Sequence, residues 1–331
     1  MEISRPSYYD EFHCIASRCP DSCCREWDVQ VDEEAVRRFA QLPGSLGETL
    51  RRSLYEEEGE VYIGFSGNRC PMWREDGLCE LQARFGEEAL CRVCREFPRL
   101  HHDYGDFKEL GLELSCPEAA RILLTAQPGP MVTEEVPGGE APGYDTGAMA
   151  VLRATRQEML ALLADPRPLG QVLALALLYG CHAQGLLDGN PVPAFDPEAA
   201  LATAREMAVP GDLPGIAEIF LGLEILTPRW RHRLSHPEGA PLQEGCRNLM
   251  RYFVGRYWLQ AVSDYDLYCR VKFMITACIV VSTLGGDFVD TAQLFSKEIE
   301  NDADNMDALL DAAYDHEALT DSRLLGILLG Y

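Results

Sequence analysis

Nine of the thirteen cysteines lie between residues 14 and 116, and their spacing indicates a metal site. Four of them fall within eleven residues, and the last two of these four are adjacent. Thiolates that converge from close pairs and from distant segments are common ligands of zinc and of iron–sulfur clusters. Nine thiols suffice for one four-cysteine site or for two, and spacing leaves zinc and iron–sulfur both open. The nine are Cys14, Cys19, Cys23, Cys24, Cys70, Cys79, Cys91, Cys94 and Cys116.

Prolines and short intervals refine this interpretation. Proline follows Cys19, Cys70 and Cys116, and it stiffens a ligand loop without adding an amide hydrogen. The C-x3-C-x2-C motif of radical S-adenosylmethionine enzymes is absent. Cys19 and Cys23 give the first interval, but Glu26 stands where the third cysteine should be.

Other catalytic signals are weak. The chain has no G-x-G-x-x-G or P-loop after a strand, no H-E-x-x-H and no G-x-S-x-G. His13 is a further ligand candidate, because it precedes Cys14. The aromatic stretch 251–260 reads as helix core, with an adenine-sized ligand as the alternative. The segment 97–107 either lines a pocket or forms a polar surface turn, and its polar residues are Arg99, His101, His102 and Tyr104.

Composition narrows the class of protein. The 331 residues carry a formal net charge of -24, from 29 basic and 53 acidic side chains. This balance argues against binding to nucleic acid or to an anionic membrane. The polar start and the lack of a spanning apolar stretch predict a cytoplasmic protein, where disulfides are rare. The remaining cysteines are expected to be small buried hydrophobes, and they are Cys181, Cys246, Cys269 and Cys278.

The elements that position these residues predict a mainly α fold. Residues 1–126 read as a small cysteine-rich α+β domain, with strands near 60–65 and 107–116 and a helix from Pro117. Residues 127–147 are rich in Pro and Gly and read as a linker. Residues 148–331 show helical periodicity and are predicted to form an all-α domain of seven to nine helices.

Three stretches resemble the flagellin lysine N-methylase (FliB) family. The resemblance runs in order over residues 8 to about 122, and a broader family of zinc- or iron-chelating cysteine-cluster proteins shares part of it. The stretches are "FHCIASRCPDSCCREWDVQVD", "RCPMWREDGLCELQARFGEEALCRVCREFPR" and "LELSCPE".

The resemblance implies methyl transfer from S-adenosylmethionine to lysine side chains of a flagellin-like protein. It also implies an iron–sulfur cluster, of the four-iron, four-sulfur kind, with zinc as the alternative metal. A non-methylating iron–sulfur enzyme and a zinc-stapled binding module remain open, and the sequence identifies neither the catalytic residues nor the S-adenosylmethionine site. Carried over residue by residue, the expected metal ligands are Cys14, Cys19, Cys23, Cys24, Cys70, Cys79, Cys94 and Cys116.

Overall fold

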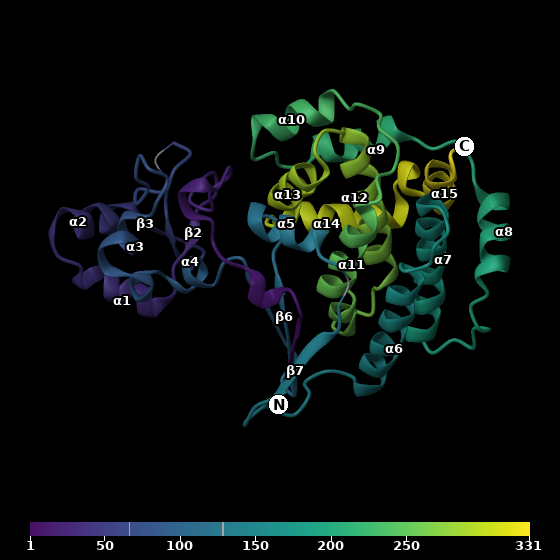
Figure 1. Ribbon diagram of the computed structural model, residues 1–331, viewed down its shortest axis with the longest axis horizontal. Helices are drawn as coiled ribbons and strands as arrows, with labels where there is room; N and C mark the ends of the chain where they lie inside the picture. The colour runs from purple at the N-terminus through teal and green to yellow at the C-terminus, as the bar shows by residue number, and fades with distance from the viewer. Residues whose placement is uncertain (66, 128) are drawn as a thin grey trace.

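The computed structural model describes residues 1–65, 67–127 and 129–331. The described residues form fifteen α-helices and seven β-strands, so the fold is mainly α, as predicted. Figure 1 shows a small lobe made from early residues and a larger lobe that is mostly helical. A four-stranded sheet lies on the side of the larger lobe that faces the small one.

The small lobe combines a three-stranded antiparallel sheet, in the order β2-β4-β3, with four short helices. Asp32 accepts a hydrogen bond from the amide of Ala35 and thereby caps the first helix. Phe39 and Leu50 are fully buried in the core of this lobe. Its elements are β2 (Val29–Gln30), α1 (Glu33–Gln41), α2 (Gly44–Ser53), β3 (Leu54–Glu57), β4 (Glu60–Ile63), α3 (Glu80–Phe85) and α4 (Arg92–Glu96).

The second sheet has the order β5-β6-β1-β7, with β1 parallel to β6 and antiparallel to β7. Strand β7 falls inside the predicted linker, and its five residues are all exposed, so no apolar alternation marks it in the sequence. Residue 128 of that linker lies outside the described residues, and the division of the chain at 126 and 148 stays a prediction. The strands are β1 (Glu2–Pro6), β5 (Arg99–Asp103), β6 (Phe107–Leu112) and β7 (Met131–Glu135).

Helices make up the rest of the larger lobe. Among the described residues ten α-helices follow residue 145, not seven to nine. The prediction missed α10, whose apolar signal is only Trp230 and Leu234, and α15, which has Gly326 in its interior. The helices are α5 (Pro117–Thr125), α6 (Thr146–Leu162), α7 (Leu169–Leu187), α8 (Pro197–Met207), α9 (Leu213–Gly222), α10 (Pro228–Ser235), α11 (Cys246–Tyr257), α12 (Tyr268–Leu284), α13 (Phe288–Ile299), α14 (Ala303–Asp315) and α15 (Asp321–Leu329).

Helix α12 is the centre of the larger lobe and packs against α7, α11, α13, α14 and α15. Its hydrophobic cluster extends to the sheet, where Phe107 and Leu112 of β6 join it. Tyr9 and Phe12 belong to the same cluster, so the chain leaves the larger lobe just before Cys14. The cysteine loop therefore starts from a fixed point on this lobe.

One helix, α7, is long and apolar enough to cross a membrane by length and composition. However, 56% of its most apolar window is buried inside the protein. It packs against α6, α8, α12 and α15, which is the setting of a core helix.

Candidate metal centre

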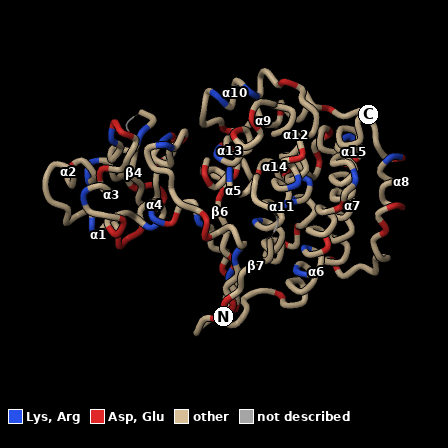
Figure 2. Tube along the Cα trace, viewed as in Figure 1, with Lys and Arg blue, Asp and Glu red and all other residues tan. Residues whose placement is uncertain are grey.

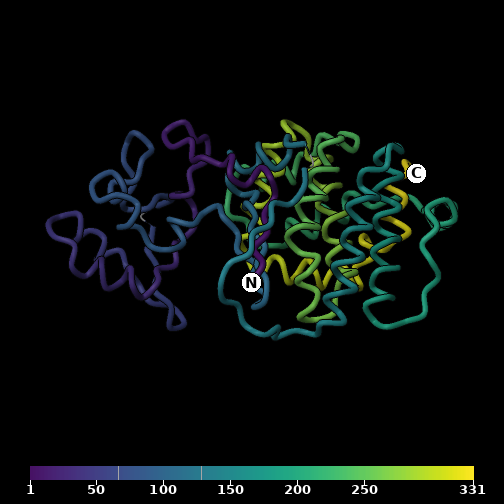
Figure 3. Tube along the Cα trace, turned by 60° about the horizontal axis from the view of Figure 1, so that its bottom comes forward, coloured from purple at the N-terminus to yellow at the C-terminus, as the bar shows by residue number. Residues whose placement is uncertain are grey.

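Seven of the nine early cysteines line one cavity of about 410 Å³. The cavity lies at the loop of residues 12–27, the purple segment between the lobes in Figures 1 and 3. Cys70 and Cys91, which do not line it, are buried in the small lobe's core. The lining cysteines are Cys14, Cys19, Cys23, Cys24, Cys79, Cys94 and Cys116.

Local backbone structure places three of the nine early thiols at helix starts. Cys79, Cys91 and Cys116 are the residues immediately before α3, α4 and α5. Burial raises the pKa of Cys79 and Cys116, and a hydrogen bond with Cys94 lowers the pKa of Cys91. Backbone amides of the first helical turns act in the lowering direction on all three thiols. A helix start favours negative charge on sulfur, which is the form that binds metal.

The loop that carries the other four lining cysteines is pinned to the small lobe. The amide of Cys70 donates to the carbonyl of Cys24 at 3.0 Å, and the amide of Glu26 donates to Asn68 at 3.1 Å. Ala16 and Glu26 both have positive φ angles, of 51° and 78°, which turn the loop back on itself. These turns bring residues 14–24 face to face with the later cysteines.

The thiols fall into two neighbouring groups, defined by which thiolates raise the pKa of which other thiols. The pKa of Cys23 is raised by its hydrogen bond with Cys24, by burial, and by charge on Cys24, Cys14 and Cys116. Cys24 acts on Cys70, Cys79 and Cys94. We call Cys14, Cys19, Cys23 and Cys116 the first thiol group, and Cys24, Cys70, Cys79, Cys91 and Cys94 the second thiol group. The adjacent pair Cys23 and Cys24 joins the two groups.

Burial opposes thiolate formation at most of these sites. It raises the pKa of both Cys70 and Cys116 to about 12. Cys24 is an exception, because its hydrogen bond with Cys23 lowers its pKa to about 7. A bound cation would offset the cost of several buried negative sulfurs. A metal or an iron–sulfur cluster bound here would hold these sulfurs as thiolates.

A buried lysine from the larger lobe fixes the loop. Lys297 of α13 has a side chain only 1% exposed, and its Nζ lies 2.8 Å from Asp21 and 2.6 Å from Glu26. The same Nζ lies 4.9 Å from the ring centroid of Trp27. Gln293, one turn earlier, donates to Asp21 at 2.9 Å and to the Ser115 carbonyl at 2.7 Å. The loop is therefore clamped between α13 and the small lobe.

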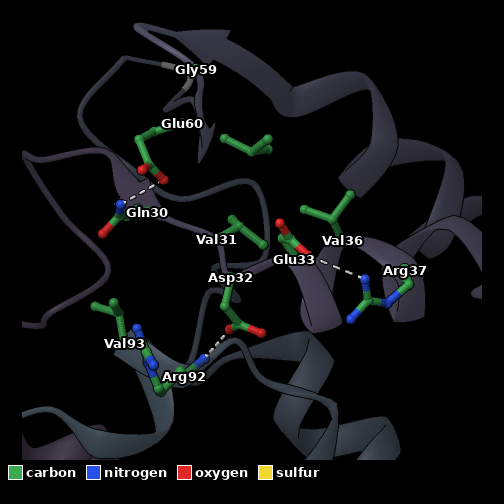
Figure 4. Close-up of a pocket in the computed structure, with 11 residues that line it drawn as sticks. Gln30, Val31, Asp32, Glu33, Val36, Arg37, Gly59, Glu60, Arg92 and Val93 are labelled. Carbon is green, nitrogen blue, oxygen red and sulfur yellow. Dashed lines mark hydrogen bonds and ion pairs between the residues drawn. The ribbon is translucent and has the colours of Figure 1, made fainter.

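A larger hollow, of about 560 Å³, lies on the small lobe beside α1 and α4 (Figure 4). Its polar side chains satisfy one another: Glu60 accepts from Gln30, and Glu33 accepts from Arg37. Asp32 accepts from the amide of Arg92 at 2.7 Å and caps α1. These carboxylates have structural partners, so the hollow is a weaker candidate for chemistry than the cysteine cavity.

The structure brings all eight expected ligands into the two thiol groups. The resemblance left out Cys91, which also belongs to the second thiol group; its C-x2-C spacing to Cys94 was the available signal. His13 lines the cavity beside Cys14, whereas His102 lines a different cavity. The ligands themselves stay a prediction.

The four later cysteines lie away from this centre. Cys246, Cys269 and Cys278 are buried, as predicted, but Cys181 is exposed, which contradicts its expected burial. Cys181 lies on α7, which is mostly buried but has one uncovered side. The apolar sequence of this helix did not show that Cys181 lies on the uncovered side.

The thiols are not arranged around a single point. Within residues 1–65, 67–127 and 129–331, no three Cys, His, Asp or Glu side chains are placed to hold one metal ion. A tetrahedral zinc needs every sulfur at about 2.3 Å from one centre. A cluster with several irons contacts each thiolate through a different iron and so keeps the sulfurs further apart.

The fold and the cavity define a class of helical proteins with a cysteine-rich segment between two lobes. The chain belongs to the family of the flagellar protein FliU and the FliB-type lysine-N-methylases. It is 30% identical to "Flagellar biosynthetic protein FliU" of Salmonella muenchen over 131 residues, or 38% of this chain and 78% of that protein.

Two proteins named "Lysine-N-methylase", from Salmonella typhimurium and Salmonella choleraesuis, are each 29% identical over 131 residues. The match spans only 33% of the length of each, and 38% of this chain. No family model and no solved structure matches the chain.

Proposed function

We propose that this protein is an S-adenosylmethionine-dependent protein-lysine N-methyltransferase whose early cysteines hold an iron–sulfur cluster. The observation that carries the proposal is that seven cysteines line one cavity and two more are buried in the core of the small lobe, in a chain whose relatives include proteins named lysine-N-methylase. The names of the relatives support lysine methylation. The set of cysteine donors supports a bound metal.

Iron–sulfur fits the thiol arrangement better than a lone zinc ion. The first thiol group offers four cysteines, which is the number that a four-iron cluster takes. The second thiol group offers five and can hold a further site. When bound, a cluster with one iron free of cysteine supplies a Lewis acid for polar groups of the methyl donor, and a cluster held only by cysteines stiffens the loop.

The chain's own residues must handle the proton of the substrate. A lysine ammonium attacks only after losing a proton, so a base must stand within reach of its nitrogen. His13 and Glu87 line the cysteine cavity, and neither has a hydrogen-bond partner among the described side chains. In the transfer itself, the lysine nitrogen bonds to the methyl carbon, the carbon–sulfur bond breaks, and its electron pair stays on the sulfur of S-adenosylhomocysteine.

The charge of the protein suits a lysine-bearing partner. Acidic residues outnumber basic ones by 53 to 29, and Figure 2 shows them on both lobes rather than on one face. Such a surface attracts lysine-rich proteins at long range. We propose a flagellin-like protein with exposed lysines as the substrate.

The direct test is incubation of anaerobically purified protein with S-adenosylmethionine and flagellin, followed by intact mass measurement of the flagellin. The proposal expects mass increments of whole methyl groups. The Cys23→Ala variant is the matched negative control, and Cys278→Ala, in the helical core, is the positive one. No increments with a fully loaded cluster would leave a non-methylating iron–sulfur enzyme, and colourless protein with stoichiometric zinc would leave the zinc-stapled module.

A further inference from the structure

A second cavity lies within the larger lobe, on the other side of strand β5 from the cysteines. Arg99 of this strand lines the cysteine cavity, whereas its neighbours Leu100 and His102 line a cavity of about 320 Å³. Helices α11, α12 and α14 supply most of the other walls. This volume is at the lower end of the range for small-molecule sites, and a space between packed helices is a usual place for one.

The floor of this cavity is a buried charged network. The side chain of Glu300 is fully buried, and its carboxylate accepts hydrogen bonds from Tyr257 at 2.7 Å and from Tyr252 at 3.0 Å. Arg256 adds an ion pair to Glu300 at 3.4 Å. Glu300 therefore has three partners and needs no cation from a ligand.

Arg256, in contrast, has spare hydrogen-bonding capacity. Its Nη1 donates to Tyr252 at 2.6 Å and faces Glu300. The hydrogen bonds of the described residues include none from its Nη2 or Nε, and its side chain, 12% exposed, lines the cavity. A guanidinium has five donors arranged as a fork that matches a carboxylate. Nη2 and Nε of Arg256 are open to solvent and available to an acceptor on a ligand.

The rim carries the opposite charge. Asp307 is exposed on α14, lines the cavity, and has no ion-pair or hydrogen-bond partner among the described side chains. Arg270, the second arginine that lines the cavity, is already paired with Asp264 at 2.7 Å. A simple anion would be repelled by Asp307, and a simple cation by Arg256. A zwitterion with its carboxylate inward and its ammonium at the rim satisfies both.

The remaining wall is apolar. Leu100, Phe273, Met306 and Leu310 line it. His102 adds an uncharged imidazole near neutral pH, since burial and the charge of Arg256 lower its pKa to about 4. An unbranched apolar side chain fits this wall better than a charged one.

We propose that this cavity binds the α-amino-acid head of a methionine-type ligand, with the carboxylate on Arg256 and the ammonium on Asp307. The ligand has two sources with this chemistry: S-adenosylmethionine, or a free amino acid. Assignment to S-adenosylmethionine rests on the proposed function and places the methyl donor's head on the helical lobe. The cysteines then act as a frame beside it, and the base for the lysine is a residue near this cavity rather than His13 or Glu87.

Calorimetric titration of the full-length, anaerobically purified protein with S-adenosylhomocysteine, methionine and adenosine tests the proposal. S-adenosylhomocysteine and methionine should bind, and adenosine at least about tenfold more weakly, because it lacks the amino-acid head. Binding of methionine and not of S-adenosylhomocysteine assigns the cavity to a free amino acid. Absence of binding by both overturns the proposal.

Variants locate the binding. Asp307→Asn should weaken methionine binding about fivefold or more, and Asp311→Asn, one turn further on α14 and equally exposed, should leave it unchanged. Arg256→Gln should weaken it about tenfold or more; a melting curve reports whether this variant folds, and Asp307→Asn carries the test if it does not. Wild-type affinity in Asp307→Asn refutes the assignment.

The two proposals fail separately. Binding without flagellin methylation removes the methylase and leaves this site. Methylation of flagellin without measurable binding of S-adenosylhomocysteine at this cavity removes the site and leaves the methylase.

Discussion

The two lobes are built on different kinds of core. In the small lobe, Cys70 and Cys91 are buried among Phe39, Leu50 and a few other apolar residues, and three more cysteines pack against them. In the larger lobe the cluster around α12 contains dozens of apolar side chains, and of its cysteines only Cys116 belongs to a thiol group. The comparison teaches that the larger lobe has an extensive apolar core, whereas the small lobe has few apolar side chains and would gain stability from a metal bound to its thiols.

Removal of the metal should have the largest effect and should separate the lobes. Chelation is expected to abolish amide-exchange protection in α1 and α2, because their small core loses its cross-links. Cys19→Ala or Cys23→Ala is expected to lose metal from the first thiol group. Protection in α7 and α12 should not change. Metal analysis and hydrogen-exchange mass spectrometry check this.

The matched controls are Cys181→Ala and Cys278→Ala, which should keep the metal. Full metal content in Cys19→Ala and Cys23→Ala would show that the first thiol group is not the ligand set. Equal loss of protection in both lobes would show that the larger lobe also depends on the metal.

Loss of the clamp that Lys297 makes between the lobes should have the second-largest effect. Lys297→Met removes the cation that Asp21 and Glu26 share. Loss of one partner of a buried pair costs about 3–5 kcal/mol, and the cost here should lie below that, because Gln293 still donates to Asp21 and Arg25 still pairs with Glu26. Limited proteolysis should cut the loop of residues 14–27 faster. Lys272→Met removes another buried lysine, inside the larger lobe, and should lower stability without exposing the loop. An intact loop in Lys297→Met would contradict the clamp.

Acid should weaken the larger lobe through His102. Burial, reinforced by Arg256, lowers its pKa to about 4 in the folded protein, below about 6.5 in the unfolded chain. The unfolded state therefore binds the proton first, and stability falls as pH drops from about 6.5 to about 4, by about 3 kcal/mol in total.

Denaturant titrations at pH 7 and pH 4.5 measure this effect. His102→Asn should lose less stability over that interval than the wild type does. His101→Asn, on the exposed side of the same strand, should behave like the wild type. An unchanged pH profile in His102→Asn would place the acid sensitivity elsewhere.

Surface ion pairs should matter least, and equally in both lobes. Glu33→Gln removes a pair with Arg37 on α1, and Glu118→Gln removes one with Arg121 on α5. Each change should cost less than about 0.5 kcal/mol, since exposed pairs are screened by water and salt. Thermal melts of the two variants check this, and a loss above about 1 kcal/mol in either would mean that its glutamate has a further role.

The sequence predicted the thiols of the centre better than their surroundings. Local spacing and helix signals identified Cys14 to Cys24, α5 and the strand at 107, because those patterns depend on nearby residues. Lys297 was not found, since it meets Asp21 across 276 residues and looks like any helical lysine. Strand β7 was missed because it is wholly exposed.

Helix α15 illustrates a different limit. Glycine in a helix interior counts against a helix prediction, because it lacks a side chain to restrict the backbone. At Gly326, however, a Cβ would lie 1.7 Å from the carbonyl oxygen of Val209. The glycine is there for a close backbone approach, which only the tertiary structure reveals.

The clamp at Lys297 also sets an order of events during synthesis. The cysteine loop leaves the ribosome 276 residues before the lysine that holds it, which at typical elongation rates is roughly tens of seconds. Throughout that interval the loop is translated but α13 does not yet exist to hold it. Asp21 and Glu26 thus wait for their lysine until the chain is almost complete, and the loop can take its final position only when α13 docks.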